Sequence, residues 1–223
     1  MNIYFQLNSK LKEKSKNKTD IIYVNFRMGC TSSYDNSNYV RTITFVGLEG
    51  SGKSNIVFHF VAASSANFVP LPTAGVEFHE FELGTSKFQI YDCGGVSRYR
   101  SQWPYYISKS DGVVFVIDRT DKERMGRMQE EIGEVFRLCQ DLKIPILIFI
   151  NKSDKETNLT SDDFIKITKV QDYNLEYGIE DCSASTGNGI NEGKKWILQH
   201  VHPRNASDSM SESGEGNDGG EKP

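Results

Sequence analysis

The stretch Gly47-Leu48-Glu49-Gly50-Ser51-Gly52-Lys53-Ser54 decides the fold, because it matches the phosphate-binding pattern G-x-x-x-x-G-K-[ST]. It lies between an apolar, strand-like run at Arg41–Val46 and a helical run at Lys53–Ala66. Glycines allow backbone N–H groups to close around phosphate oxygens, and a helix N-terminus adds the positive end of its dipole. We therefore predict that this P-loop holds the phosphates of a nucleotide through Gly47, Glu49, Gly50, Ser51, Gly52, Lys53 and Ser54.

Two side chains of the P-loop carry chemistry of their own. Lys53 supplies a point charge to the β- and γ-phosphates, and the Ser54 hydroxyl can ligate Mg²⁺. The nucleotide and Mg²⁺ are thus predicted together.

Strand-like and helix-like runs alternate outward from the P-loop. Strands are predicted at Arg41–Val46, Val76–Leu83, Lys87–Asp92, Gly112–Asp118 and Ile144–Ile150, and a short strand-like segment precedes Ser183. Helices are predicted at Lys53–Ala66, Asp121–Gln140, Thr160–Val170 and Ile190–His200. The turn signal Gly84-Thr85-Ser86 indicates one antiparallel hairpin. We expect an α/β fold, with a mostly parallel six-stranded sheet and helices on both faces.

Asn151-Lys152-Ser153-Asp154 follows the strand predicted at Ile144–Ile150. Ligands of open α/β sheets bind at the carboxyl ends of strands. A carboxylate there can accept two hydrogen bonds from guanine N1–H and the exocyclic amine, whereas adenine offers no matching pair of donors. Asp154 therefore predicts selection of guanine over adenine, with the stem of Lys152 covering the base. In the later loop Ser183-Ala184, a small residue lets a backbone N–H reach the guanine O6.

Bulk composition limits the class of protein. The chain has 223 residues, a net charge of -4 and ordinary contents of hydrophobic (37%) and charged (25%) residues, so it predicts one domain with tails and no nucleic-acid partner. There is no apolar run of spanning length and no secretory signal, which favours a cytoplasmic protein. The cysteines are widely spaced, so we expect neither zinc nor disulfides. We expect a monomer.

Taken together, residues of about 40–200 resemble the Arf and Arf-like family of Ras-superfamily small GTPases. The motifs that carry the resemblance are Gly47-Leu48-Glu49 in the P-loop, Pro72-Thr73-Ala74-Gly75 as switch I, Asp92-Cys93-Gly94-Gly95 at the start of switch II, Trp103 and Tyr106, Cys182-Ser183-Ala184, and Glu192-Gly193 before Trp196. The resemblance implies a small G domain that binds GTP or GDP with Mg²⁺.

The resemblance also implies roles for the switch residues. Thr73 would ligate Mg²⁺ in the GTP state, Asp92 would hold the metal through water, and Gly95 would donate its N–H to the γ-phosphate. Gly95, Thr73 and Lys53 would then form the catalytic set, and Ser54, Thr73 and Asp92 the metal set. The hairpin Val76–Asp92 would move with the nucleotide state. Effectors would bind switch I, this hairpin and switch II, and an exchange factor and an activating protein would regulate the cycle.

One residue departs from the family pattern. Val96 follows Gly95 where most of the family has a glutamine that orients the attacking water. Valine has no side-chain hydrogen-bonding group, so we expect slow intrinsic hydrolysis. For Arg98 and Arg100 we favour a solvated or partner-facing role over that of an arginine finger. A ciliary Arf-like branch also lacks the glutamine and acts partly as an exchange factor, so the alternative function is a GTP-locked binding module or exchange factor.

The two ends of the chain differ from its middle. Residues 1–39 are predicted to be an N-terminal extension, residues 40–203 the G domain, and residues 204–223 a disordered acidic tail. Within the extension, Met28-Gly29-Cys30-Thr31-Ser32-Ser33 reads as an acylation signal, which functions only if translation starts at Met28. A helix at Met1–Lys12 is the alternative membrane contact. We expect peripheral association with Golgi membrane, endomembrane or cilium.

Overall fold

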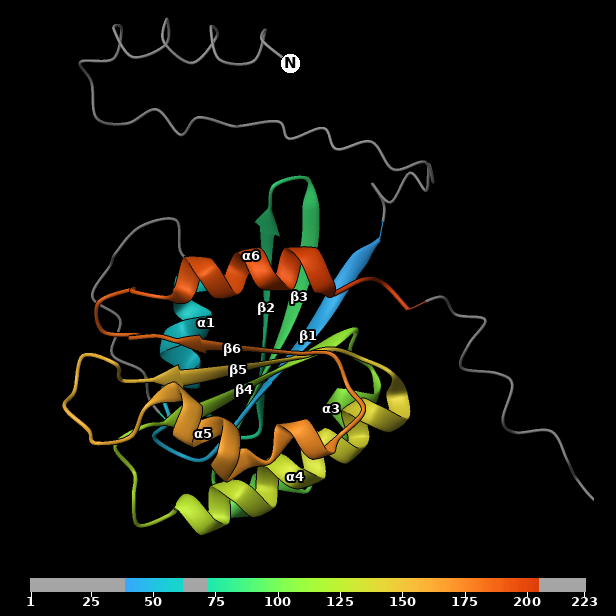
Figure 1. The fold of residues 1–223 in the computed structure, drawn as a ribbon. Coiled ribbons are helices and arrows are strands. Elements are labelled where there is room, and N and C mark those ends of the chain that lie inside the picture. Colours follow the sequence, from blue (N-terminus) through green and yellow to red (C-terminus); the bar gives the residue numbers. More distant parts are fainter. Residues whose placement is uncertain (1–38, 62–71, 205–223) are drawn as a thin grey trace, which may run out of the picture. The chain divides into compact units, whose positions relative to one another are not determined.

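A computed structural model describes residues 39–61 and 72–204 (Figure 1). The described residues form a six-stranded sheet in the order β2-β3-β1-β4-β5-β6, in which only the β2–β3 pair is antiparallel. The strands are β1 (Val40–Val46), β2 (Val76–Leu83), β3 (Ser86–Cys93), β4 (Gly112–Asp118), β5 (Ile146–Asn151) and β6 (Tyr177–Asp181). The predicted fold class is confirmed.

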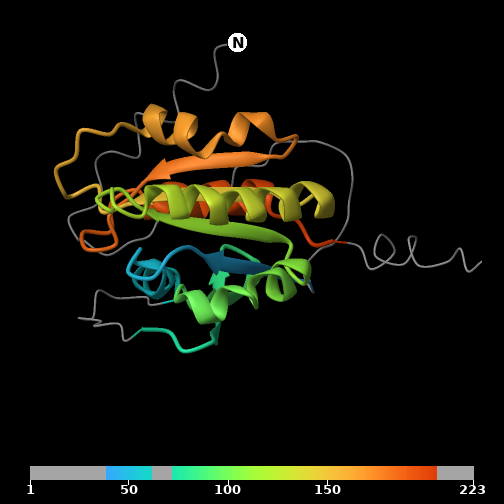
Figure 2. The same cartoon turned by 90° about the horizontal axis from the view of Figure 1, so that it is seen from below.

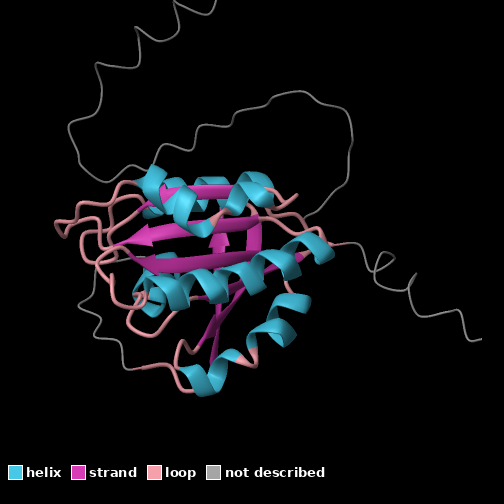
Figure 3. Ribbon diagram, turned by 60° about the horizontal axis from the view of Figure 1, so that its bottom comes forward, coloured by secondary structure: helices cyan, strands magenta, loops and turns pink. Residues whose placement is uncertain are grey.

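Helices cover both faces of this sheet, as Figures 1 and 3 show. The helices are α1 (Lys53–Val61), α2 (Ser97–Arg100), α3 (Trp103–Ser108), α4 (Met125–Leu142), α5 (Ser161–Thr168) and α6 (Ile190–His200), with a 3₁₀ turn at Val170–Asp172. Helices α1 and α6 pack on one face, and α3, α4 and α5 on the other, where α4 runs along the sheet (Figure 2). None of the helices among the described residues is long and apolar enough to cross a bilayer.

The sheet separates two apolar cores. Side chains of β4 alternate between them: Val113, Phe115 and Ile117 face α3 and α4, whereas Val114 and Val116 face α1 and α6. Every residue of β5 is buried, as expected of a central parallel strand covered on both faces. Because β1, β3, β4, β5 and β6 run parallel, the loops that follow them meet at one edge of the sheet.

Several element boundaries differ from the predicted ones. The helix expected from Asp121 begins at Met125, because the Asp121 carboxylate accepts hydrogen bonds from the Arg124 backbone and side chain and closes a separate turn. Strand β5 begins at Ile146, after Pro145, which has no N–H to donate. Helix α5 begins at Ser161, since Thr160 is its N-cap, in a capping box with Asp163. The short helices α2 and α3 carry no periodic pattern long enough to predict.

Some predictions concern residues that the structure does not describe. These are the last residues of the helix predicted to Ala66, the extension before Tyr39 with Gly29 and Cys30, and the tail after Arg204.

Gly193 on α6 shows how tightly that helix packs on the sheet. A Cβ at this position would lie 2.2 Å from Phe149 Cζ and 3.2 Å from Leu147 Cδ2, and both side chains are fully buried. We expect Gly193→Ala to lower the free energy of unfolding by about 1–3 kcal/mol through overpacking, measured by urea denaturation with nucleotide held constant.

The matched control is Gly126→Ala on α4, where a Cβ would meet nothing within 4 Å. Because alanine has a higher helix propensity than glycine, the free energy of unfolding of Gly126→Ala should equal that of the wild type or exceed it by up to about 1 kcal/mol. Equal effects of the two substitutions would contradict the packing described for α6.

Candidate functional site

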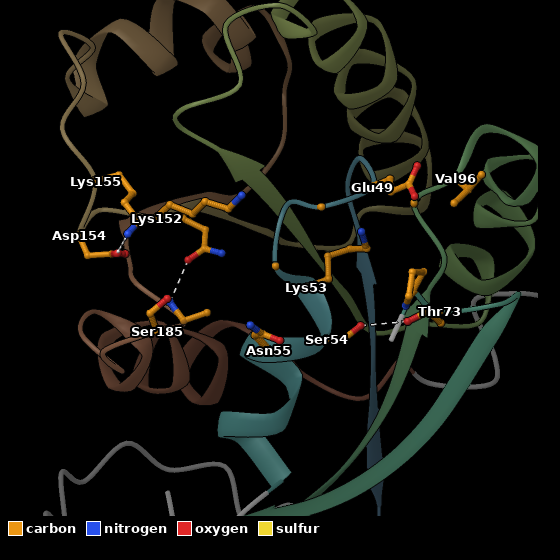
Figure 4. A pocket seen from close by; sticks show the side chains of 16 residues that line it. Glu49, Lys53, Ser54, Asn55, Thr73, Val96, Lys152, Asp154, Lys155 and Ser185 are labelled. Carbon is orange, nitrogen blue, oxygen red and sulfur yellow. Dashed lines mark hydrogen bonds and ion pairs between the residues drawn. The ribbon is translucent and has the colours of Figure 1, made fainter. Parts of the chain in front are cut away.

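A pocket of about 500 Å³ opens at the edge of the sheet where the parallel strands end (Figure 4). Glu49 and Val96 lie near one end of it, and Lys152 and Asp154 lie at the other. It is lined by Glu49, Gly50, Gly52, Lys53, Ser54, Asn55, Pro72, Thr73, Gly95, Val96, Asn151, Lys152, Asp154, Lys155, Ala184 and Ser185. Segments separated by over a hundred residues in the chain thus share one cavity.

The P-loop joins β1 to the start of α1. Its glycines at positions 47, 50 and 52 all have positive φ, a conformation that side chains disfavour. Lys53 is buried, and its ammonium donates to the carbonyls of Gly47 at 2.8 Å and Leu48 at 3.0 Å. Burial lowers the pKa of Lys53 to about 8, a shift that Asp92 opposes only in part. A phosphate beside this ammonium would offset the cost of burying it, so the loop favours a polyanion.

Three oxygen-bearing side chains converge beside the P-loop. The Ser54 hydroxyl donates to Asp92 Oδ2 at 2.5 Å and lies 3.0 Å from Thr73 Oγ1. Asp92 is fully buried, its Oδ1 has no hydrogen-bond partner among the described residues, and burial raises its pKa. An all-oxygen set with an unpartnered carboxylate oxygen fits a hard cation such as Mg²⁺. The predicted metal residues are therefore gathered in one place.

Asp154 is held at the opposite end of the pocket. Its Oδ1 accepts a hydrogen bond from the Ser183 hydroxyl at 2.6 Å, which lowers the pKa of Asp154 and keeps it ionised at neutral pH. Lys152, in the left-handed conformation, reaches across to Asp118 at the end of β4, with 2.5 Å between Nζ and Oδ2. The carboxylate is thus oriented for accepting hydrogen bonds, and the Lys152 stem is fixed along the pocket wall.

The backbone N–H of Ala184, which is predicted to reach the guanine O6, has a partner within the protein. It donates to Asn151 Oδ1 at 2.9 Å. Its carbonyl is 2.7 Å from His59 Nε2 on α1, a contact that no sequence pattern signalled. The loop carrying Ser183 and Ala184 is therefore braced from two sides, and a guanine O6 would have to share or displace the bond to Asn151.

Switch II lies directly against the P-loop. A Cβ on Gly95 would lie 2.5 Å from Glu49 N and 2.6 Å from Gly47 O, so only glycine fits there. Val96 follows as a pocket-lining residue, so an apolar side chain lies at this end of the pocket (Figure 4).

Of the two arginines predicted to be solvated or partner-facing, Arg98 is exposed as predicted, whereas Arg100 is not. Arg100 is neither solvated nor partner-facing: its Nε donates to Gly95 O at 2.8 Å and its Nη1 pairs with Glu131 at 3.0 Å, with both side chains nearly buried. The Arg98 guanidinium lies over the Tyr99 ring, 4.7 Å from its centroid. One contact with the P-loop was not predicted. Arg124, which precedes α4, donates a hydrogen bond to the carbonyl of Glu49. Nothing in the local sequence indicated that contact.

The sequence of residues 30–201 matches the model of the ADP-ribosylation factor family. The chain belongs to the ADP-ribosylation factor family. Human ADP-ribosylation factor-like protein 5A is 31% identical over 167 residues, covering 73% of this chain and 90% of that protein. ADP-ribosylation factor J of Dictyostelium discoideum is 31% identical over 165 residues, covering 72% and 85%.

A solved member has the same fold. It is the Arl6 BBS3 small GTPase of Trypanosoma brucei with bound nucleotide analogue GppNp, with a TM-score of 0.64 and 24% identity, covering 72% of this chain and 96% of that one. Proteins of the ADP-ribosylation factor family are small GTPases, so this chain is a GTP-binding protein and a GTP hydrolase by family. Mg²⁺ is the typical metal of the family.

Proposed function

We propose that the chain is a GTP- and GDP-dependent switch that works at a membrane in vesicular or ciliary trafficking, with slow intrinsic hydrolysis. The observation that carries the proposal is the single pocket that gathers the P-loop, the switch residues and Asp154. Residues 40–203 form its G domain, and residues 1–39 and 204–223 are extensions.

The phosphate end of the pocket would hold the β- and γ-phosphates. Backbone N–H groups of Gly47 to Ser54 would surround them, and Lys53 would leave its carbonyl partners to pair with them. Ser54 and Thr73 would ligate Mg²⁺ directly and Asp92 would hold it through water, which would give Asp92 Oδ1 the partner it lacks. When bound, Mg²⁺ neutralises charge on the phosphates. Thr73 and the Gly95 N–H would sense the γ-phosphate.

The other end of the pocket would hold guanine. Asp154, fixed by Ser183, would accept hydrogen bonds from N1–H and the exocyclic amine. Asn151 would hold the P-loop and the Ala184 loop at the right separation, because its amide donates to the carbonyl of Ser51 at 2.7 Å and accepts from Ala184. The stem of Lys152 would cover the base.

Val96 would slow the hydrolysis of GTP. The attacking water requires a hydrogen-bonding group to orient it, and an apolar side chain occupies that position at the pocket rim. Arg100 is committed to Gly95 and Glu131, so it does not supply the missing group. The same observation favours the second candidate, a GTP-locked binding module or exchange factor whose hydrolysis stays negligible. Turnover that stays negligible even with cell extract as a source of activating protein would favour this second candidate.

Partners would bind on the side of the hairpin and switch II. There Phe78 and Tyr91 pack edge to face at 5.2 Å between ring centroids, and Tyr91 packs on Tyr106 at the same distance. Phe78 is 59% exposed, beside the smaller Val76. Effectors would contact this surface, and an exchange factor and an activating protein would act on the switches.

Recognition of guanine is tested by Asp154→Asn. The amide loses one acceptor oxygen, so we expect GDP affinity to fall at least about a hundredfold, since each hydrogen bond to a charged group contributes about 1.5–3 kcal/mol. Xanthosine diphosphate, whose 2-oxo group can accept from the amide, should gain affinity. Competition against a fluorescent nucleotide measures both. Glu156→Gln, an exposed carboxylate outside the pocket, is the control. Equal GDP binding by wild type and Asp154→Asn would remove this residue from the site.

The effect of Val96 is tested by Val96→Gln. We expect single-turnover GTP cleavage at least about tenfold faster than in wild type, because the amide can orient water. Val96→Leu, which keeps the position apolar, should remain slow. Wild-type cleavage as fast as that of Val96→Gln would contradict slow hydrolysis.

Membrane attachment is tested by intact mass of the native protein. We propose translation from Met28 with acylation of Gly29 and Cys30, because one acyl chain binds membranes marginally and two bind stably. The expected mass is that of a chain beginning at Gly29 plus its acyl groups. An N-terminal peptide beginning at Met1 would reject this start.

A further inference from the structure

Gly95 lies between two peptides whose carbonyls are both held by switch II side chains. The Gly94 carbonyl accepts a hydrogen bond from Trp103 Nε1 at 3.1 Å, and the Gly95 carbonyl accepts one from Arg100 Nε at 2.8 Å. In a trans peptide the N–H points opposite to the C=O. Trp103 therefore fixes the plane of the peptide that carries the Gly95 N–H, and Arg100 fixes the next one. Together they orient this N–H.

The anchor of this arrangement lies on α4. Arg100 Nη1 pairs with Glu131 Oε1 at 3.0 Å, and the two side chains are only 12% and 13% exposed. Glu131 Oε1 also pairs with Arg127 Nη2 at 2.6 Å, but Glu131 is the only acidic partner of Arg100 among the described residues. Removing Glu131 would therefore leave the little-exposed Arg100 guanidinium without an ion-pair partner. The short helix α2 supplies Arg100, whereas Glu131 sits in the first half of the 18-residue helix α4. The pair thus links the short helix α2 to the long helix α4, which packs on the sheet.

Gly95 lies close against the P-loop, which restricts the conformations open to its backbone. A Cβ on Gly95 would lie within 2.6 Å of atoms of Gly47, Leu48 and Glu49, so this residue leaves no room between itself and the P-loop. The freedom that remains is rotation of the two peptides on either side of it. Trp103 and Arg100 remove that remaining freedom. A hydrogen-bond donor held in place before the ligand arrives costs less ordering entropy on binding.

We propose that Arg100, Glu131 and Trp103 are positioning residues that aim the Gly95 N–H at the γ-phosphate and so set the preference of this protein for GTP over GDP. The inference rests on the proposed role of Gly95. Because GDP has no γ-phosphate, loosening this arrangement weakens binding of the triphosphate and leaves the diphosphate unaffected. A purely structural role would weaken both nucleotides equally.

The experiment compares dissociation constants for GDP and for a non-hydrolysable GTP analogue in Arg100→Gln and Glu131→Gln, with Mg²⁺ present. We expect analogue affinity to fall about tenfold or more, as for a lost charge-assisted hydrogen bond, while GDP affinity stays within about twofold. Arg100→Lys keeps the positive charge but lacks the planar guanidinium with its several donors. Its affinity for the analogue should lie between those of the wild type and Arg100→Gln. Arg137→Gln, which breaks an exposed Arg–Glu pair on the same helix, should leave the ratio unchanged.

Trp103→Phe provides an independent arm, since it removes the indole donor without touching the ion pair. Trp103→Phe should lower affinity for the GTP analogue but not for GDP, and the loss should be smaller than in Arg100→Gln. Equal losses for both nucleotides, or an unchanged ratio in every variant, would overturn the inference while leaving the proposed function standing. Failure of the wild-type protein to bind either nucleotide would instead overturn the proposed function.

Discussion

The side-chain amide of Asn151, at the end of β5, holds three loops together at the ligand-binding edge. Its Nδ2 donates to the Ser51 carbonyl, and its Oδ1 accepts from the Ala184 N–H and, at 3.6 Å, from the Cys182 thiol. The side chain is buried, so losing it would leave several polar groups without partners, at about 1–3 kcal/mol each. Gly52 is obligatory beside it, because a Cβ there would lie 2.2 Å from Nδ2. The separation of the P-loop from the loop that carries Ala184 thus depends on one buried amide.

Burial disfavours the charged forms of Lys53 and Asp92 in the pocket. Burial shifts the pKa of Lys53 downward, which Asp92 opposes in part, and the pKa of Asp92 upward, which the hydrogen bond from Ser54 and then the charge of Lys53 oppose in part. A phosphate next to Lys53 and a cation next to Asp92 reverse both penalties. Nucleotide and metal are therefore expected to stabilise the folded domain as well as to occupy it.

The sequence was most informative where glycine or a strand end restricts the backbone. The P-loop and Asn151–Asp154 could be placed correctly because each follows an apolar strand, and parallel strands bring their carboxyl ends together. Contacts made by long side chains across the fold could not be predicted. Arg100 reaches Glu131 over 31 residues and Arg124 reaches Glu49 over 75, and neither distance leaves a local pattern. The start of α4 was misplaced because an Asp–Arg turn competes with the helix there.

Strand β2 forms an open edge of the sheet, since β3 is its only partner among the described strands. An edge strand presents unpaired N–H and C=O groups that invite pairing with another chain. Here three exposed glutamates, at positions 77, 80 and 82, line that edge. Their mutual repulsion opposes pairing of two copies through β2, so this edge can stay uncovered without promoting aggregation. That protection is electrostatic, so high ionic strength, which screens exposed charges, would weaken it.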